Sequence, residues 1–296
     1  MDAEVQEEPT MALVVISHRT DGLLERCLAS LSACRDVDQW SLVIVRQRPD
    51  GVPDPCSGAM SGLRWASEVH IQAGGLPTER LIDRNRALAY DVAFRSLDAD
   101  ACLVVEDDVL LAPDALVFCR SMLVRYAECR PFRGVNLGSH ETGRGAKPEG
   151  YSLLRFGLHG QAGMLTAKTW RYLDDARLLD WRLQGHWDAR IEDFMKSGFT
   201  ATPNRSRYLD LGTTGVHRNS ASDSIYFAKL RESWIGDEPV TPNSYRLEQM
   251  HHTWRRDARG YRAWESLRYR PGLLKWFRAL RRSLRGGKTA SKWHGR

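Results

Sequence analysis

Short apolar runs rich in β-branched residues recur through the first half of the chain. Residues 12–17 (ALVVIS), 41–45 (SLVIV) and 101–108 (ACLVVEDD) have little polar alternation, which is typical of strands buried on both faces of a sheet. Helical spacing of apolar residues predicts helices over 23–33 and from Thr78 to about Leu97. Alternating strands and helices indicate an α/β fold with a mostly parallel central sheet flanked by helices.

The remaining segments follow a less regular pattern. A helix is predicted at 113–128, where Pro113 opens an amphipathic segment. Residues 49–77 are rich in Pro, Gly and Ser and predict a long loop with one short strand at 67–72. Beyond residue 130 the pattern predicts further strands at 134–139, 151–157 and 201–212, and helices at 166–176 and 186–198.

Composition places the chain among ordinary globular proteins. It has 296 residues, of which 42% are hydrophobic and 27% charged, enough for one large domain or two moderate ones. This excludes a disordered chain, a collagen and a small disulfide scaffold, and no apolar run approaches the ~18–20 residues of a membrane span. The six cysteines lack zinc-site spacing, so we expect reduced structural thiols.

Charge is distributed unevenly along the chain. Residues 255–296 hold 14 Lys and Arg against 2 acids, whereas the rest holds 29 against 35. We therefore expect an acidic flexible arm at 1–10, a main domain at 11–250 and a basic amphipathic tail at 251–296. The arm is too acidic for a secretory signal, so a cytoplasmic protein is expected.

The tail mixes basic residues with Trp, Phe and Leu over 259–285. This pattern is typical of a helix lying on an anionic membrane surface, which would make the protein peripheral on the inner membrane face. A helix packed on the main domain and a contact with single-stranded nucleic acid remain alternatives. No RNA-binding motif is present, so no specific nucleic acid is expected.

Three consecutive acids end the predicted strand at 101–108. We call Glu106, Asp107 and Asp108 the strand-end acids. Ligands of open parallel sheets bind beyond the carboxyl ends of the strands, and side-chain alternation would put Glu106 and Asp108 on one side. Carboxylate oxygens suit Mg²⁺ or Mn²⁺ bridged to a diphosphate. The alternative, acids that offset a helix dipole, fits Asp114 better.

The segments VVISHRTDGLLERCLASL, SLVIV and LVVEDDVLLAPDAL resemble the nucleotide-sugar half of a GT-A glycosyltransferase. The EDD form followed by APD is similar to N-acetylglucosaminyltransferase I, and less closely to lipopolysaccharide glycosyltransferases. The resemblance implies a GT-A fold in which Glu106 and Asp107 face the donor nucleoside and sugar while Asp108 binds the metal. The chain departs from that family in having Arg48 where an acid recognises uracil, and it looks like a soluble bacterial-type relative without the Golgi enzymes' membrane anchor.

The resemblance continues at 155–173 and 186–217, the second of which is similar to the segment that carries the catalytic base. Glycosyl transfer by direct displacement needs a carboxylate to accept the proton of the acceptor hydroxyl. Asp188, Glu192 and Asp193 are the candidates, and a WD pair favours Asp188 whereas the EDFM block favours the other two. Asp188 and Glu192 share one helix face. Trp187 is either a platform for a sugar ring or a core residue.

Several further residues are candidates for donor contacts. Arg19 follows the first strand, and Asp83 and Arg84, with Arg86, lie on the helix where the resembled family contacts the base. His217 is a candidate late ligand of the metal or diphosphate, with Asp210 as a second candidate and Arg218 as a possible partner of the leaving diphosphate. For each, surface charge or a structural hydrogen bond is the alternative.

These observations predict a hexosyl- or N-acetylhexosaminyltransferase. It would move a sugar from a nucleotide-diphosphate donor to a glycan or lipid-linked acceptor, using Mn²⁺ or Mg²⁺, and the resemblance implies inversion. One alternative is a nucleotidyltransferase that makes a nucleotide sugar, although residues 17–22 (SHRTDG) lack the Gly-rich basic loop of that class. The other is a non-catalytic GT-A-like binding module at a membrane.

Overall fold

The computed structural model describes eleven stretches of the chain: residues 8–17, 22–48, 66–73, 76, 78–139, 147–155, 157–183, 186–212, 228–237, 240 and 244–250. The chain divides into two units, 1–249 and 250–296, and the fold reported below is that of the first. The predicted basic tail at 251–296 lies outside the described residues. No helix within these stretches is long and apolar enough to cross a membrane.

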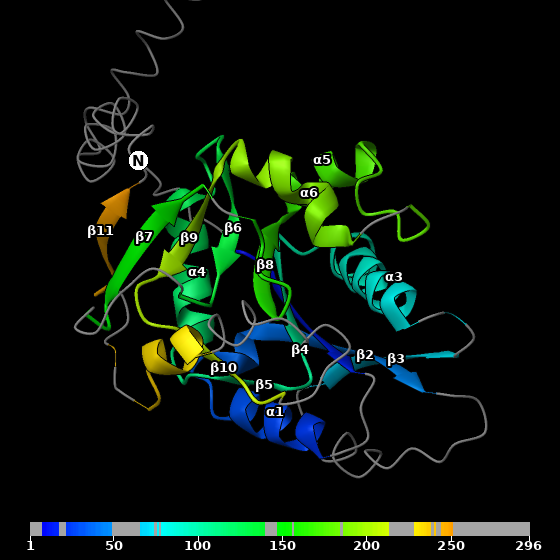
Figure 1. The fold of residues 1–296 in the computed structure, drawn as a ribbon, viewed down its shortest axis with the longest axis horizontal. Helices are drawn as coiled ribbons and strands as arrows, with labels where there is room; N and C mark the ends of the chain where they lie inside the picture. The colour runs from blue at the N-terminus through cyan, green and yellow to red at the C-terminus, as the bar shows by residue number, and fades with distance from the viewer. Residues whose placement is uncertain are drawn as a thin grey trace, which may run out of the picture. The chain divides into compact units, whose positions relative to one another are not determined.

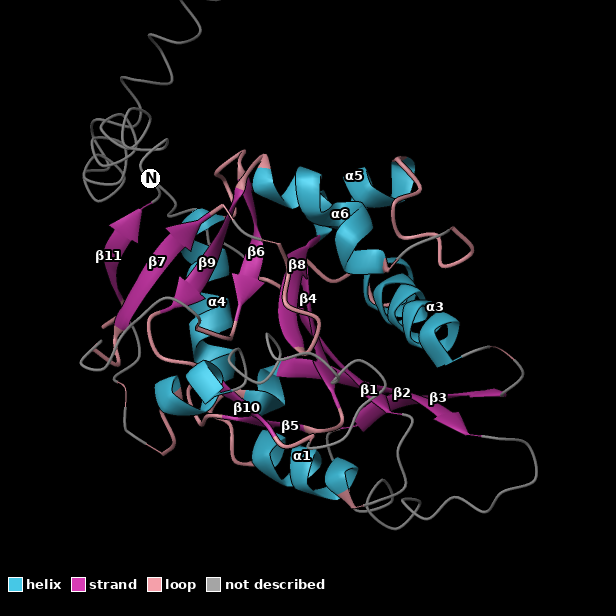
Figure 2. Cartoon of the chain, viewed as in Figure 1, coloured by secondary structure: helices cyan, strands magenta, loops and turns pink. Residues whose placement is uncertain are grey.

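A nine-stranded sheet forms the centre of this unit, in the order β11-β7-β9-β6-β8-β4-β1-β2-β3 (Figures 1 and 2). Four neighbouring strands are parallel: β3, β2, β1 and β4. Their bounds are β1 (Met11–Ser17), β2 (Trp40–Arg48), β3 (Ala66–Ala73) and β4 (Ala101–Glu106). β1 and the first five residues of β4 are buried throughout, as their apolar sequences predict.

The other half of the sheet is mixed. β8 (Ala162–Thr166) runs antiparallel to both β4 and β6 (Phe132–Asn136). β6 is parallel to β9 (Phe199–Pro203), and β9 is antiparallel to β7 (Gly150–Leu154), beside which β11 (Arg246–Met250) forms the edge. A separate two-stranded ladder joins β5 (Val109–Leu111) to β10 (Tyr208–Asp210).

Helices flank the sheet. They are α1 (Leu23–Ser32), α3 (Thr78–Asp91), α4 (Ala115–Tyr126), α5 (Ala167–Asp175) and α6 (Trp187–Lys196), with a 3-10 turn, η1 (Val37–Gln39). α3 continues as a π-helical turn, η2 (Val92–Ser96), and α5 begins where Thr166 Oγ1 accepts a hydrogen bond from the Thr169 backbone N–H at 3.2 Å. α3, α5 and α6 lie together on one side of the sheet (Figure 1).

One hydrophobic cluster explains why these three helices share a side. Ala12, Val14 and Ile16 alternate along β1 and point into the cluster, where they join apolar residues from β2 and β4. α3 and η2 contribute Tyr90 and Phe94, and Phe94 stacks on Trp170 of α5 with 5.0 Å between ring centroids. α6 adds Trp187, Ile191 and Met195.

The predicted fold class, α/β with a mostly parallel central sheet flanked by helices, is confirmed. The predicted helices and most predicted strands are present within a few residues of their expected bounds. One detail was wrong: the strand expected at 101–108 ends at Glu106, and the chain turns at Asp107 and Asp108 before β5. Side-chain alternation therefore does not decide which sides these two aspartates face.

Five cysteines lie in the described stretches, and all are free thiols. Cys27, Cys34, Cys102 and Cys119 are buried, and Cys129 is half-buried. Burial raises the pKa of Cys34 to about 12, with a smaller contribution from the negative charge of Asp114. Burial also raises the pKa of the other three buried thiols, so these four stay uncharged and pack as small apolar residues.

Candidate active site

The strand-end acids are anchored by different neighbours. Asp107 is 1% exposed, and its Oδ2 accepts a hydrogen bond from the hydroxyl of Ser17, at the end of β1, at 2.8 Å. Its backbone N–H bonds the carbonyl of Ile16 at 3.1 Å. Glu106 keeps 32% of its side chain exposed and pairs with Arg86 of α3 at 2.9 Å. Asp107 is therefore fixed beneath the surface, whereas Glu106 reaches toward solvent.

Negative charge accumulates at this end of the sheet. Burial raises the pKa of the Cys27 thiol well above its usual value, and the charges of Asp107 and Asp108 raise it further. Cys27 also donates from its sulfur to the Glu106 carbonyl at 3.7 Å. Asp107 and Asp108 therefore lie close enough to Cys27 for their charges to act on its thiol.

The β5–β10 ladder brings Asp210 to the same place. Asp210 pairs with Val109, the residue after Asp108, and the backbone N–H of Leu211 donates to the Asp108 carbonyl at 2.8 Å. Both carboxylates are buried. Asp210 Oδ1 accepts from the Gly212 backbone N–H at 2.8 Å, which fixes one of its oxygens. Asp108 and Asp210 are thus neighbours in space although 102 residues separate them in the chain.

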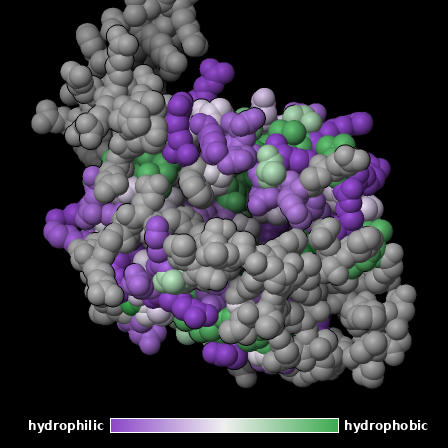
Figure 3. Space-filling view, viewed as in Figure 1, coloured by the Kyte–Doolittle hydropathy of each residue, from purple (hydrophilic) through white to green (hydrophobic). Residues whose placement is uncertain are grey.

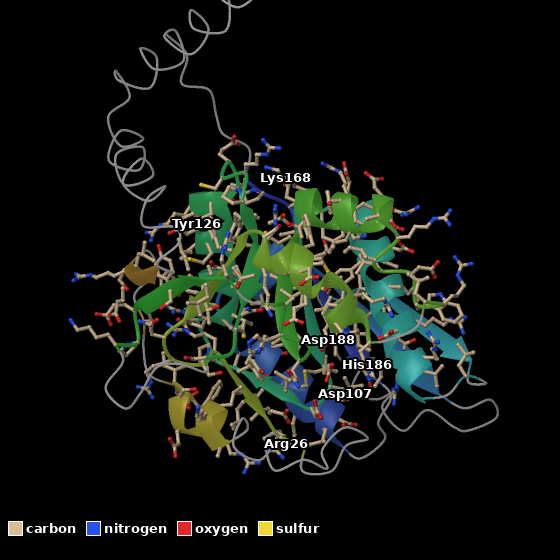
Figure 4. All side chains as sticks on the ribbon, turned by 45° about the horizontal axis from the view of Figure 1, so that its top comes forward. Arg26, Asp107, Tyr126, Lys168, His186 and Asp188 are labelled. Carbon is tan, nitrogen blue, oxygen red and sulfur yellow. The ribbon has the colours of Figure 1, made fainter. Side chains whose placement is uncertain are left out.

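The start of α6 lies beside the strand end. Arg86, which pairs with Glu106, also stacks over the ring of Trp187, with 4.3 Å from its guanidinium carbon to the ring centroid. Trp187 is the first residue of α6 and is buried. Figure 4 places the labelled Asp107, His186 and Asp188 in one part of the molecule. Trp187 is thus a core residue, and Asp188 follows it at the edge of the site.

The three candidate bases differ in their surroundings. All are exposed, and hydrophilic side chains make up much of the described surface over α5 and α6 (Figure 3). Asp188 lies in the first turn of α6, where a negative charge also stabilises the helix. Glu192 forms an ion pair with Lys196 one turn later and lies near Gly157. Of the three, Asp188 directly follows Trp187, whose ring lies against the guanidinium of Arg86, the ion-pair partner of Glu106.

Asp83 and Arg84 contact the α6 side of the molecule. Buried Asp83 pairs with Arg190 of α6 at 3.2 Å. Arg84 lies over the ring of Trp181, with 5.7 Å to its centroid, in the connection between α5 and α6. Their predicted donor contacts stay predictions. Arg19, His217 and Arg218 lie outside the described residues.

Sequence reasoning missed three residues of this region. Ser17 was treated only as the last residue of an apolar strand, and Arg190 was not singled out. Arg46 is 1% exposed and pairs with Ser17 in the β1–β2 register, so a cationic side chain is buried at the carboxyl end of β2. An arginine directly after the apolar run 41–45 was the available signal for it.

The carboxylates at this edge could supply part of a divalent-cation site. Among the described residues no group of three or more His, Cys, Asp or Glu side chains is arranged to hold a metal. Asp108 and Asp210 supply two buried carboxylates from adjacent segments, and oxygen ligands of this kind fit Mg²⁺ or Mn²⁺ with remaining positions taken by phosphate or water. The predicted partner His217 is not among the described residues.

No protein-family model matches the chain, and no curated protein matches it. Among solved structures, S. aureus TarS 1-349 is similar at 12% identity and a TM-score of 0.47, over 67% of this chain and 59% of that one. A second S. aureus TarS structure has 12% identity and a TM-score of 0.46, over 67% of this chain and 36% of that one. This chain therefore spans less than two thirds of either structure. The finer resemblance to N-acetylglucosaminyltransferase I gains no support here and stays a prediction.

Proposed function

We propose that this chain is a glycosyltransferase that moves a sugar from a nucleotide-diphosphate donor to an acceptor hydroxyl with inversion, assisted by Mn²⁺ or Mg²⁺. The observation that carries the proposal is the meeting of the strand-end acids with the first turn of α6 at the carboxyl end of a parallel sheet. An acidic edge that binds a cation, beside an exposed carboxylate, would supply both parts that such a transfer needs.

In this proposal the acids have separate tasks. Asp108 holds the metal together with Asp210 or His217, and Glu106 and Asp107 contact the nucleoside and sugar. A bound metal would offset the charge of the departing diphosphate. Asp107 is suited to a fixed contact because Ser17 and the Ile16 carbonyl hold it in place. Glu106 is suited to a contact at the surface because its side chain remains partly exposed.

Asp188 is the proposed base. It accepts the proton of the acceptor hydroxyl as the new glycosidic oxygen–carbon bond forms and the bond from the sugar to the diphosphate breaks. Its solvent-exposed position allows an acceptor to approach, and the Asp83–Arg190 pair holds the helix that carries it. Glu192 and Asp193 remain alternatives, and Glu192 is engaged by Lys196.

Donor binding tests the proposal first. We would follow thermal unfolding of the chain with a panel of nucleotide sugars in Mn²⁺, Mg²⁺ or EDTA. A donor at a hundredfold excess over its Kd stabilises the folded state by about 2.7 kcal/mol, or about 5–11 °C for a domain of this size. The expected result is metal-dependent stabilisation by one nucleotide family. It should disappear in Asp108→Asn and persist in Asp175→Asn, an exposed acid on α5.

Chemistry is tested separately. Release of nucleoside diphosphate from the stabilising donor should fall about 10²–10⁴-fold in Asp188→Asn while donor stabilisation is retained. Formation of nucleoside triphosphate and sugar 1-phosphate from the same nucleotide sugar on addition of pyrophosphate would instead indicate nucleotidyl transfer. Stabilisation by no nucleotide sugar, in a well-folded protein, would reject the proposal and favour a binding module. The anomeric configuration of the product, read by NMR, tests inversion.

A further inference from the structure

Arg86 contacts several elements at the candidate site. It is 1% exposed, whereas Arg80 and Arg84 on the same helix, α3, are half-buried. Nη2 donates to Glu106 Oε1 at 2.9 Å and to the Gly160 carbonyl at 2.7 Å. The same guanidinium covers the ring of Trp187 at 4.3 Å. One planar group therefore joins α3, the end of β4, the loop before β8 and the start of α6.

Gly160 lies in the same junction, with room for a Cβ. A Cβ at Gly160 would lie 3.8 Å from Glu106 Oε1 and 4.0 Å from Trp187 Cζ2. Glu106 and Trp187 therefore approach the same point of the loop from different elements. Trp187 immediately precedes Asp188, so a shift of the Trp187 ring moves the first turn of α6.

Polar contacts, as well as the apolar cluster, attach α6 to α3. Asp83 pairs with Arg190 at 3.2 Å, and Arg80 donates to the Trp181 carbonyl at 2.9 Å and to the Leu183 carbonyl. Arg86 differs from these two contacts because it alone, among the contacts described, also reaches a strand-end acid. Both of its hydrogen bonds come from Nη2 while the plane of the guanidinium covers the Trp187 ring, and a lysine has no such planar face.

We propose that Arg86 is a positioning residue that holds Glu106 and the first turn of α6 in one arrangement, so that bound donor and acceptor base stay aligned. The inference rests on the proposed function, because it assigns the donor to the strand end and the base to α6. Arg86 acts through Glu106 and Trp187 and accepts no proton itself. Misplacing reacting groups by about 1 Å can cost about 10²-fold in rate, so its removal should appear mainly in turnover.

Arg86→Lys separates charge from geometry. The ammonium group still offers a positive charge and hydrogen bonds to Glu106, but it lacks the planar group that covers Trp187 while Nη2 reaches Glu106 and Gly160. We expect kcat for donor turnover to fall at least about tenfold while the donor KM changes less than about threefold. Trp187→Phe, which leaves the Arg86–Glu106 ion pair intact, should show the same pattern more weakly. This variant replaces Arg86→Lys in the test if Arg86→Lys does not fold.

Arg95→Lys is the matched control. Arg95 lies in η2, directly after α3, stacks over Trp170 at 5.4 Å and pairs with Asp174 at 2.6 Å. It thus makes the same two kinds of contact as Arg86, but toward α5. Both kcat and KM of Arg95→Lys should match those of the unmodified chain.

Amide hydrogen exchange gives a readout that does not depend on turnover. Arg86→Lys should speed exchange in residues 187–192 of α6 relative to Arg95→Lys. Unchanged exchange there, or wild-type kcat in Arg86→Lys, would overturn the positioning role. If the unmodified chain turns over no nucleotide sugar, the proposed function fails and exchange alone decides whether Arg86 holds α6. The two failures are therefore distinguishable.

Discussion

Replacing Asp114 by Asn should destabilise the domain strongly, because it removes the anion from a buried ion pair. Arg207 donates from Nε and Nη2 to Asp114 Oδ2 at 3.2 Å, and their side chains are 0% and 3% exposed. The Tyr245 hydroxyl donates to the same oxygen at 3.0 Å. The Arg207 guanidinium also lies over Phe118 at 5.4 Å, so water cannot readily replace the lost carboxylate.

The expected loss follows from this burial. Removing one member of a buried pair leaves an uncompensated charge and costs about 3–5 kcal/mol. The free energy of unfolding of a domain is about 5–15 kcal/mol in total, so Asp114→Asn would remove a large part of it. For a domain of this size the loss corresponds to a Tm lower by about 6–20 °C.

The same pair supports the candidate site. The Arg207 carbonyl accepts from the Ala112 backbone N–H at 2.9 Å, and its own N–H donates to the Leu137 carbonyl at 2.8 Å. Arg207 directly precedes β10, which carries Asp210 beside Asp108. Asp114→Asn should therefore also weaken metal-dependent donor binding at temperatures where the protein remains folded.

Thermal and urea unfolding of Asp114→Asn, Arg207→Met and the double variant provide the test. Because the second substitution removes the uncompensated charge, the double variant should be more stable than Asp114→Asn alone. Arg182→Met, which removes an exposed pair with Asp180, should leave the midpoint unchanged. A double variant that loses the sum of both single losses, or a single loss below about 1 kcal/mol, would refute the reasoning.

Three further predictions concern thiols and glycines. At pH 8 a thiol reagent should leave four buried thiols unlabelled in the native chain and label them after unfolding in guanidinium, as mass spectrometry would show; these are Cys27, Cys34, Cys102 and Cys119. Labelling of any of them under native conditions would contradict their burial. Gly160→Ala should change stability by less than about 0.5 kcal/mol, whereas Gly160→Leu should fill the space between Glu106 and Trp187 and abolish donor stabilisation without unfolding the protein. Gly134→Ala should cost about 3 kcal/mol or more in urea unfolding, because its Cβ would lie 1.9 Å from the Met164 carbonyl oxygen across the β6–β8 pair, and a near-neutral effect would show that the strands separate easily.

Local pattern was sufficient for the parallel half of the fold. The apolar runs of β1, β2 and β4 predict buried strands whatever their neighbours are, and the acids that end β4 mark the edge where ligands bind. The antiparallel strand β8 was missed because AGMLT is short and precedes a stronger helix signal at Ala167. Nothing within five residues reveals the direction of a strand.

The contacts between side chains at the site were harder to predict from the sequence than the strands were. Arg86 was named with Asp83 and Arg84 as a donor contact, but sequence spacing does not show that it reaches Glu106 and Trp187. Asp210 was a secondary candidate because its pairing partner, Val109, lies far away in the sequence. Burial of Arg46 depends likewise on strands that flank it from other parts of the chain. Long-range pairing decides all three cases.

The β5–β10 ladder has a consequence for the order in which the protein folds during its synthesis. During synthesis the four parallel strands and the strand-end acids are complete by residue 108, whereas α6 begins at Trp187 and β10 at Tyr208. The contacts that close this region span long distances, 90 residues for Ser17–Asp107 and 93 for Asp114–Arg207. Closing such loops is slow compared with forming helices. A nascent chain therefore exposes its acidic edge for the time needed to make about a hundred more residues, at typically 5–20 residues per second, before the segments that complete it emerge.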